Sequence, residues 1–188
     1  MNSKENTKTF TSQLKIFGNV KVLVITALFI ALSIVLGKFL SFKIGNEIRI
    51  SLENLTLQMA GIFFGPLIGL ITGVVSDILG CILYGYAINP VITIGAGLIG
   101  FVSGLLYRYT FKNKMLIRTV LSVSSAHLIG SVIVKTIGLY LYYKTPFTVL
   151  AWRIPTYIII TVLECFIIYR LMKNRAFTNQ IESVCKKS

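Results

Sequence analysis

The chain has 188 residues, of which 55% are hydrophobic and 13% charged, and its mean hydropathy is +0.79. An average soluble domain carries about 25% charged residues, so this composition excludes a disordered chain, a disulfide-rich miniprotein and an ordinary water-soluble domain. The net charge is +13, from 19 Lys and Arg against 6 Asp and Glu. We expect one integral membrane domain, in a chain too short for an added soluble catalytic module.

The first membrane helix is predicted after a polar stretch over residues 1–20 that has no small-residue cleavage site and is expected to be a cytoplasmic tail. Val22–Gly37 is free of charge, and the helix extends to about Phe42 if Lys38 reaches back to the interface. Within it, Ala27 and Ala31 form a small-xxx-small pair that lets another helix approach closely. Packing within the chain and docking to another subunit both fit this pair.

Three further helices are predicted in the long apolar stretch from Asn54 to Tyr107, in which Asp77 is the one charged residue. This stretch is long enough to cross a ~30 Å hydrocarbon core more than twice, and Gly65-Pro66 and Tyr84–Pro90 divide it. The predicted helices from the second to the sixth are 49–64, 67–84, 91–107, 119–142 and 154–169. The first half of 49–64 is polar, so its outer end is expected to line protein or water rather than lipid.

The cations indicate how the helices are oriented. Three segments beside the apolar runs hold 13 of the 19 Lys and Arg residues: Lys4, Lys8, Lys15, Lys21, Arg108, Lys112, Lys114, Arg118, Arg170, Lys173, Arg175, Lys186 and Lys187. Six crossings place all three segments on one side, as the positive-inside rule expects of cytoplasmic segments. We therefore predict an all-α bundle of six transmembrane helices over 21–172, with cytoplasmic termini and a basic tail over 173–188. Membrane topology explains the charge without a nucleic-acid partner.

Catalytic and metal-binding patterns do not stand out in the sequence. Gly95–Gly100 fits GxGxxG, but it lies within a predicted span and follows no strand, so we interpret it as close helix packing. His127 has no carboxylate close in sequence and is interpreted as a packing or hydrogen-bonding residue. Three scattered cysteines fit neither a metal site nor a disulfide set. We expect a protein that is not an enzyme and needs no cofactor.

Charged residues within the predicted spans point to a ligand. Asp77, Lys135 and Glu164 are each costly in lipid unless paired or hydrated. They form either an internal ion pair or a polar pocket that opens outward. The outer connections support the pocket, because cations and aromatic rings together suit a flat heterocycle attached to an anionic group. Those connections contain Lys43, Arg49, Lys144, Arg153, Asn46, Asn89, Tyr84, Tyr86, Tyr140, Tyr142, Tyr143 and Trp152.

Several motifs together resemble one membrane family. They are the AxxxA pair of the first helix, the long outer loop after it, GIFFGP at 61–66, GVVSDILG at 73–80, YGYAINP at 84–90 and RIP at 153–155. Over roughly residues 20–172 the chain resembles the S component, or substrate-binding subunit, of energy-coupling factor (ECF) vitamin transporters. Together with RIP at the start of the last predicted helix, these motifs resemble the folate-specific FolT branch.

The resemblance implies a bundle that binds a vitamin near its outer face, beneath loops. It implies docking through Ala27 and Ala31 onto an EcfT-like membrane coupling subunit, uptake driven by two cytoplasmic ATPases, and toppling of the S component in the membrane. Asp77 would accept hydrogen bonds from the pterin of folate, and outer cations would pair with its glutamate. Another vitamin such as riboflavin, and a ligand-free structural or regulatory subunit, stay open. The expected ligand contacts are Asp77, Asn89 and Arg153, and then Tyr84, Arg49 and Lys135.

Overall fold

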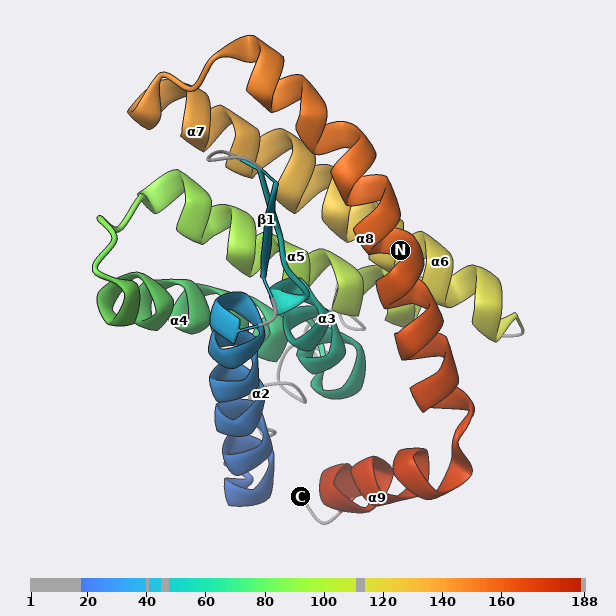
Figure 1. The fold of residues 1–188 in the computed structure, drawn as a ribbon. Helices are drawn as coiled ribbons and strands as arrows, with labels where there is room; N and C mark the ends of the chain where they lie inside the picture. Colours follow the sequence, from blue (N-terminus) through green and yellow to red (C-terminus); the bar gives the residue numbers. More distant parts are fainter. Residues whose placement is uncertain (1–17, 40, 45–47, 111–113, 187–188) are drawn as a thin grey trace, which may run out of the picture.

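The structure is a computed structural model that describes residues 18–39, 41–44, 48–110 and 114–186. The short helix α3 contacts α2, α4, α5 and α8 and lies among the longer helices (Figure 1). In chain order the elements are α2 (Val20–Phe39), β1 (Phe42–Ile44), β2 (Ile48–Ile50), α3 (Glu53–Phe64), α4 (Pro66–Tyr84), α5 (Pro90–Tyr109), α6 (Met115–Ala126), the π-helix η1 (His127–Val134), α7 (Lys135–Tyr143), α8 (Phe147–Lys173) and α9 (Arg175–Lys186).

Five helical segments of the described chain are long and apolar enough to cross a membrane. They are Val20–Phe39, Pro66–Tyr84, Pro90–Tyr109, Met115–Tyr143 and Thr148–Lys173. The remaining segment, α3, has 12 residues, of which ten are buried, so it is enclosed by protein rather than by lipid. A 12-residue helix is about 18 Å long, well short of a ~30 Å hydrocarbon core. With α3, these segments form the predicted six-helix bundle.

The predicted start of the second helix at residue 49 is wrong. Residues 42–44 and 48–50 form an antiparallel strand pair in which Arg49 lies opposite Lys43. Ile and Phe recur at alternate positions here, which favours strands, and Gly45-Asn46 is a hairpin-turn signal in the sequence. The helix starts only at Glu53, after this alternation ends.

Glycines bring α3, α4 and α5 together at backbone distance. A Cβ atom added at Gly100 would lie 2.1 Å from the carbonyl oxygen of Gly69, and one added at Gly61 would lie 2.1 Å from the carbonyl oxygen of Gly100. No larger side chain fits at these crossings without moving a backbone. The interpretation of the GxGxxG pattern as a helix-packing surface is confirmed.

The last two membrane segments differ from the prediction, one in its helix type and the other in where it starts. The fifth runs through α6, η1 and α7 without a break, and its middle is π-helical from His127. The sixth begins at Phe147, so the predicted start at Ile154 is wrong and Pro155 lies inside the helix. Proline is tolerated inside membrane helices because neighbouring groups satisfy the freed backbone carbonyl. Pro146 lies directly before α8 and marks its start in the sequence.

The residues predicted as a basic tail contain the helix α9. Its apolar side chains fold back onto the bundle: the Phe177 ring lies 5.5 Å from the Phe63 ring, and Ile181 packs against the cluster of Val22, Phe64 and Ile68. α9 therefore covers the end of the bundle at which α2 begins, as Figure 1 shows.

Candidate ligand-binding cavity

A cavity of about 780 Å³ lies at one end of the bundle. Its wall comes from the C-terminal halves of α2 and α4, the N-terminal halves of α3, α5 and α8, and α7. This volume is within the range of sites that hold a drug-sized ligand. Away from the cavity, α3, α4 and α5 meet through the glycine contacts at backbone distance, which leaves no space between them at those crossings.

Five of the six predicted ligand contacts line this cavity. They come from three membrane segments and the turn before α5: Asp77, Tyr84, Asn89, Lys135 and Arg153. The sixth, Arg49, lies on β2, and its side chain is outside the described part of the structure. The cavity thus brings together residues that are up to 76 positions apart in the sequence, from Asp77 to Arg153.

Asp77 is half-buried on α4 and is held by the neighbouring helix. The hydroxyl of Thr93 on α5 donates a hydrogen bond to its Oδ2 atom at 2.7 Å. A carboxylate has about four lone-pair positions, so this bond leaves acceptor capacity toward the cavity.

Arg153 enters the cavity wall from the second turn of α8. Its Nη2 atom donates to the carbonyl oxygen of Ser131 at 3.3 Å and to the hydroxyl of Tyr157 at 3.2 Å. Its buried Nε atom has no hydrogen-bond partner among the described residues, and no described carboxylate forms an ion pair with it. The guanidinium is therefore positioned by neutral groups, and no described carboxylate offsets its charge.

Lys135, unlike Arg153, has an acidic neighbour. Its Nζ atom lies 3.9 Å from Oε1 of Glu53, the first residue of α3. Glu164 pairs instead with His127, at 2.6 Å. The hypothesis of an internal ion pair among Asp77, Lys135 and Glu164 is therefore wrong for the described residues, because Lys135 and Glu164 each have another partner.

Asn89 and Tyr84 line the cavity but also hold the structure together. The side-chain oxygen of Asn89 accepts hydrogen bonds from the backbone of Val91 at 3.0 Å and Ile92 at 3.4 Å, which caps α5. The hydroxyl of Tyr84 donates to the carbonyl oxygen of Ile34 and so ties the end of α4 to α2. Their predicted ligand contacts stay predictions, beside these structural roles.

Sequence reasoning missed several wall residues. Ser51 lines the cavity from just before α3, Glu53 and Asn54 line it from the start of α3, and Tyr157 lines it from α8. The polar first half of the second predicted helix was the available signal for the first three, and its expected contact with protein or water is confirmed. Tyr157 lies in an apolar run, where one more aromatic residue gives no signal.

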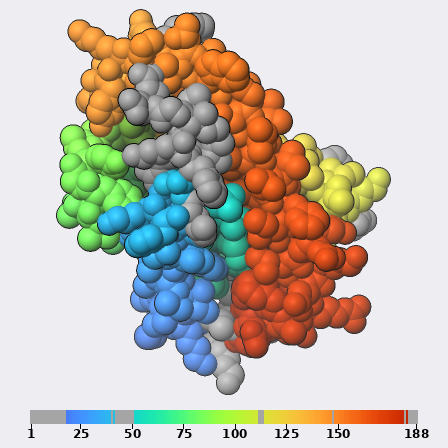
Figure 2. All heavy atoms as spheres, in the orientation of Figure 1, coloured from blue at the N-terminus to red at the C-terminus, as the bar shows by residue number. Residues whose placement is uncertain are grey.

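The predicted docking pair lies on the surface. Ala27 and Ala31 are both exposed on α2, while Val22, Thr26 and Ser33 of the same helix are buried against the bundle. Figure 2 shows α2 as a ridge on the outside of the molecule. Packing within the chain was the alternative for this pair, but neither alanine is buried against another described helix.

Comparisons with known proteins agree on the family and the fold. The model of the family described as ECF-type riboflavin transporter, S component, matches residues 17–176. A folate transporter FolT from Clostridium novyi (strain NT) is 36% identical over 96 residues, which cover 50% of this chain and 53% of the relative. The chain thus spans about half the length of this curated relative in the match.

A crystal structure of FolT bound with folic acid superposes with a TM-score of 0.67 at 23% identity and covers 81% of this chain and 92% of that one. This likeness shows that the two proteins share a fold. The family model also matches most of the chain, so both comparisons extend over the whole bundle and not over one segment of it. The chain is a multi-pass membrane protein that belongs to the family of ECF-type riboflavin transporter S components.

Proposed function

We propose that this S component binds folate in its cavity and delivers it for ATP-driven uptake by partner subunits. The main support for this proposal is the guanidinium of Arg153, which lines the cavity without a carboxylate partner among the described residues. A cation that is partly removed from water favours an anionic ligand, since charge-assisted hydrogen bonds then replace its lost hydration. Folate has an α- and a γ-carboxylate on its glutamate, whereas riboflavin has none.

Asp77 supports the same ligand from another helix. Its free acceptor positions suit the amino and ring N–H groups of the pterin, which are hydrogen-bond donors. Tyr84 and Tyr157 add aromatic faces to the wall. The relative that matches over about half of its length is named a folate transporter, and the structural neighbour holds folic acid, which adds support. The family description names riboflavin instead. Riboflavin is therefore the rival ligand.

The cavity is proposed to face the outside of the cell. Cations cluster at the opposite end of the bundle, where α5 ends and α6 begins and where α8 ends and α9 begins, as the positive-inside rule expects of the cytoplasmic side. They are Arg108, Lys114, Arg118, Arg170, Lys173 and Arg175. ATP hydrolysis is assigned to two partner ATPases, coupled through an EcfT-like membrane subunit.

A thermal-shift panel of vitamins on the purified protein tests the ligand. A ligand present at 100 times its Kd stabilises the folded state by about 2.7 kcal/mol, so folate should raise the melting temperature and riboflavin should not. Stabilisation by riboflavin alone would replace the proposed ligand, and stabilisation by no vitamin would favour a structural subunit.

Arg153→Ala then tests the observation that carries the proposal. Loss of a charged hydrogen bond to the ligand costs about 1.5–3 kcal/mol, so folate binding should weaken roughly 10- to 100-fold. Lys144→Ala is the matched control, because Lys144 is a cation at the same end of the bundle but is not part of the described cavity wall. Wild-type folate affinity in Arg153→Ala would remove the assignment.

Docking is tested separately from ligand binding. Ala31→Trp places a large side chain on the exposed face of α2 and should abolish copurification with an EcfT-like subunit, while folate affinity of the isolated protein stays unchanged. Ile159→Trp, at an exposed position of α8, is the control and should leave copurification intact. Equal copurification of both variants would refute docking through α2.

A further inference from the structure

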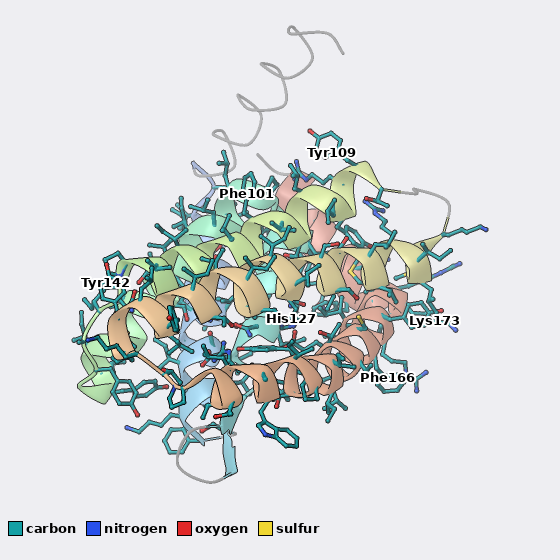
Figure 3. The ribbon with its side chains drawn as sticks, turned by 90° about the horizontal axis from the view of Figure 1, so that it is seen from above. Phe101, Tyr109, His127, Tyr142, Phe166 and Lys173 are labelled. Atoms are coloured by element: carbon teal, nitrogen blue, oxygen red, sulfur yellow. The ribbon has the colours of Figure 1, made fainter. Side chains whose placement is uncertain are left out.

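Behind the cavity wall lies a buried polar cluster that the proposed ligand contacts do not use. It consists of Gln58 on α3, His127 at the start of η1 and Glu164 on α8, which are 0%, 2% and 0% exposed. None of the three belongs to the described lining of the cavity. His127 points from its own helix toward α8, between the two layers of helices (Figure 3).

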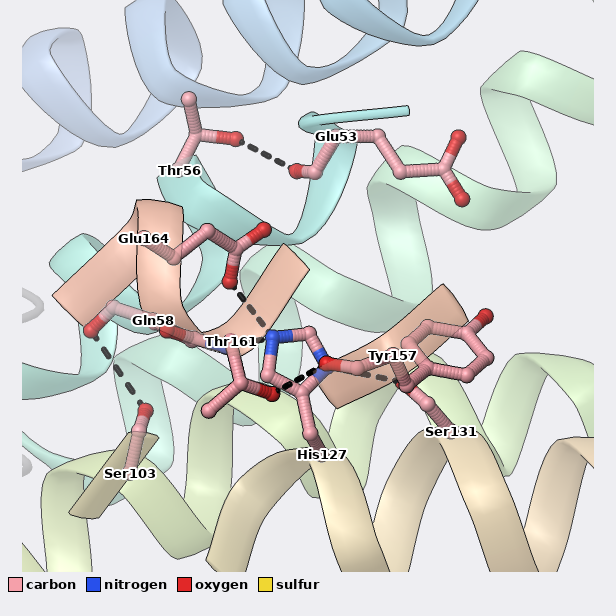
Figure 4. Close-up of polar contacts among 9 residues, drawn as sticks. All are labelled: Glu53, Thr56, Gln58, Ser103, His127, Ser131, Tyr157, Thr161 and Glu164. Atoms are coloured by element: carbon pink, nitrogen blue, oxygen red, sulfur yellow. Dashed lines mark hydrogen bonds and ion pairs between the residues drawn. The ribbon is translucent and has the colours of Figure 1, made fainter. Parts of the chain in front are cut away.

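His127 is the centre of this cluster. Its Nε2 atom lies 2.6 Å from Oε2 of Glu164 and 2.9 Å from Nε2 of Gln58 (Figure 4). Which of these atoms donates depends on the tautomer of the imidazole, and burial favours polar groups that are paired in this way. The cluster therefore holds α3, η1 and α8 together through hydrogen bonds.

The other side of the imidazole leads to the cavity. Nδ1 of His127 lies 3.3 Å from the hydroxyl of Ser131, and the carbonyl oxygen of Ser131 accepts the hydrogen bond from Arg153. The rings of His127 and Tyr157 lie 5.6 Å apart, and Cζ of Arg153 lies 5.2 Å from the centre of the Tyr157 ring. The two groups that hold the Arg153 guanidinium, Ser131 and Tyr157, are thus both in contact with His127.

We propose that His127 and Glu164 are positioning residues for ligand binding. They fix Ser131 and Tyr157 from behind, and through them they fix the orientation in which Arg153 meets a ligand carboxylate. An arginine side chain that is already fixed loses less rotamer freedom when the ligand binds, which strengthens binding without a new contact. This inference rests on the proposed folate-binding function.

The test compares two ligands and five substitutions in the purified full-length protein. Folate carries the carboxylates, and 6-hydroxymethylpterin carries the pterin without them. His127→Phe keeps a ring beside Tyr157 but removes both nitrogens, Glu164→Leu removes the carboxyl group, and Glu164→Gln keeps a neutral hydrogen-bonding group. Arg153→Ala removes the positioned group. Thr72→Val is the control, because its buried hydroxyl bonds only within α4, to Ile68, and lies outside the described cavity wall.

The expected signature is selective for the carboxylate ligand. His127→Phe and Glu164→Leu should weaken folate binding by roughly tenfold, the scale of one lost hydrogen bond, and leave pterin affinity within about twofold. Glu164→Gln should restore folate affinity to within about threefold of wild type. Combined with Arg153→Ala, His127→Phe should add no further loss, because its effect passes through Arg153. Where a single variant does not fold, His127→Phe/Glu164→Leu replaces both partners with apolar groups.

Four results would overturn the inference. They are equal losses for both ligands, additive losses with Arg153→Ala, a loss in Glu164→Gln as large as in Glu164→Leu, and wild-type folate affinity in the double variant. A wild-type protein that binds no folate would overturn the proposed function and this inference together. Folate binding by the wild type with unselective variants would overturn this inference alone.

Discussion

Gly100 lies where α5 meets α4, and Gly100→Ala is predicted to destabilise the protein. The new methyl group would lie 2.1 Å from the carbonyl oxygen of Gly69, whereas ordinary van der Waals contact begins at 3.4 Å. The helices would have to separate by about 1.3 Å, the difference between these two distances. The obstacle is backbone, which has no rotamer to change, so the strain cannot be relieved by one side chain.

The expected size follows from measured overpacking. Added methyl groups in tightly packed cores cost typically 1–3 kcal/mol, and a backbone clash belongs at the upper end, about 3 kcal/mol. For a chain of this length each kcal/mol lowers the melting temperature by about 2–4 °C, so the variant should melt about 6–12 °C below wild type. The measurement is thermal unfolding of the ligand-free protein in detergent.

Gly80→Ala is the matched control for this experiment. A Cβ atom at Gly80 meets only Cε2 of Tyr84, at 3.8 Å, which is an ordinary contact. Alanine is better than glycine inside a helix by roughly 0.5–1 kcal/mol, so this variant should melt at or above the wild-type temperature. Equal melting temperatures for Gly100→Ala and Gly80→Ala would refute the argument that the glycines are required for close packing.

Two further predictions concern single wall residues. Asp77→Ala should weaken folate binding by roughly tenfold or more in a calorimetric titration. A double-mutant cycle of Asp77 with Lys135 should give no coupling energy, because Lys135 pairs with Glu53. A coupling energy above about 1 kcal/mol would restore the ion-pair hypothesis. Asn89→Ala should lower the free energy of unfolding by about 1 kcal/mol through the lost cap of α5, and an unchanged midpoint in denaturant would contradict the capping role.

The membrane segments could be predicted because lipid imposes a simple rule on the sequence. A span must be apolar for most of its length, and Gly65-Pro66 and Asn89-Pro90 mark the breaks so plainly that α4 and α5 begin at the two prolines. The charged residues of the site were equally visible in the sequence, since a charged Asp77 or Lys135 within an apolar span stands out against its neighbours.

The remaining features depend on tertiary contacts that leave no local signal. Pro155 resembles a helix start, but α8 begins two turns earlier at Phe147, and Leu150 in this added part is buried. His127 and Glu164 are 37 positions apart, and no spacing rule connects them. The helix α9 is the exception: it is polar on average, but Phe177 and Ile181 recur four positions apart on one face, and this face packs on Phe63 and Val22.

The glycine crossings have a consequence for the route of a transported molecule. At Gly61, Gly69 and Gly100 the helices leave no room for even one methyl group, so a vitamin cannot pass between them without prising the backbones apart. Among the described helices, α3, α4 and α5 therefore form a wall that is closed at these crossings, and the cavity has no path through that wall to the opposite end of the bundle.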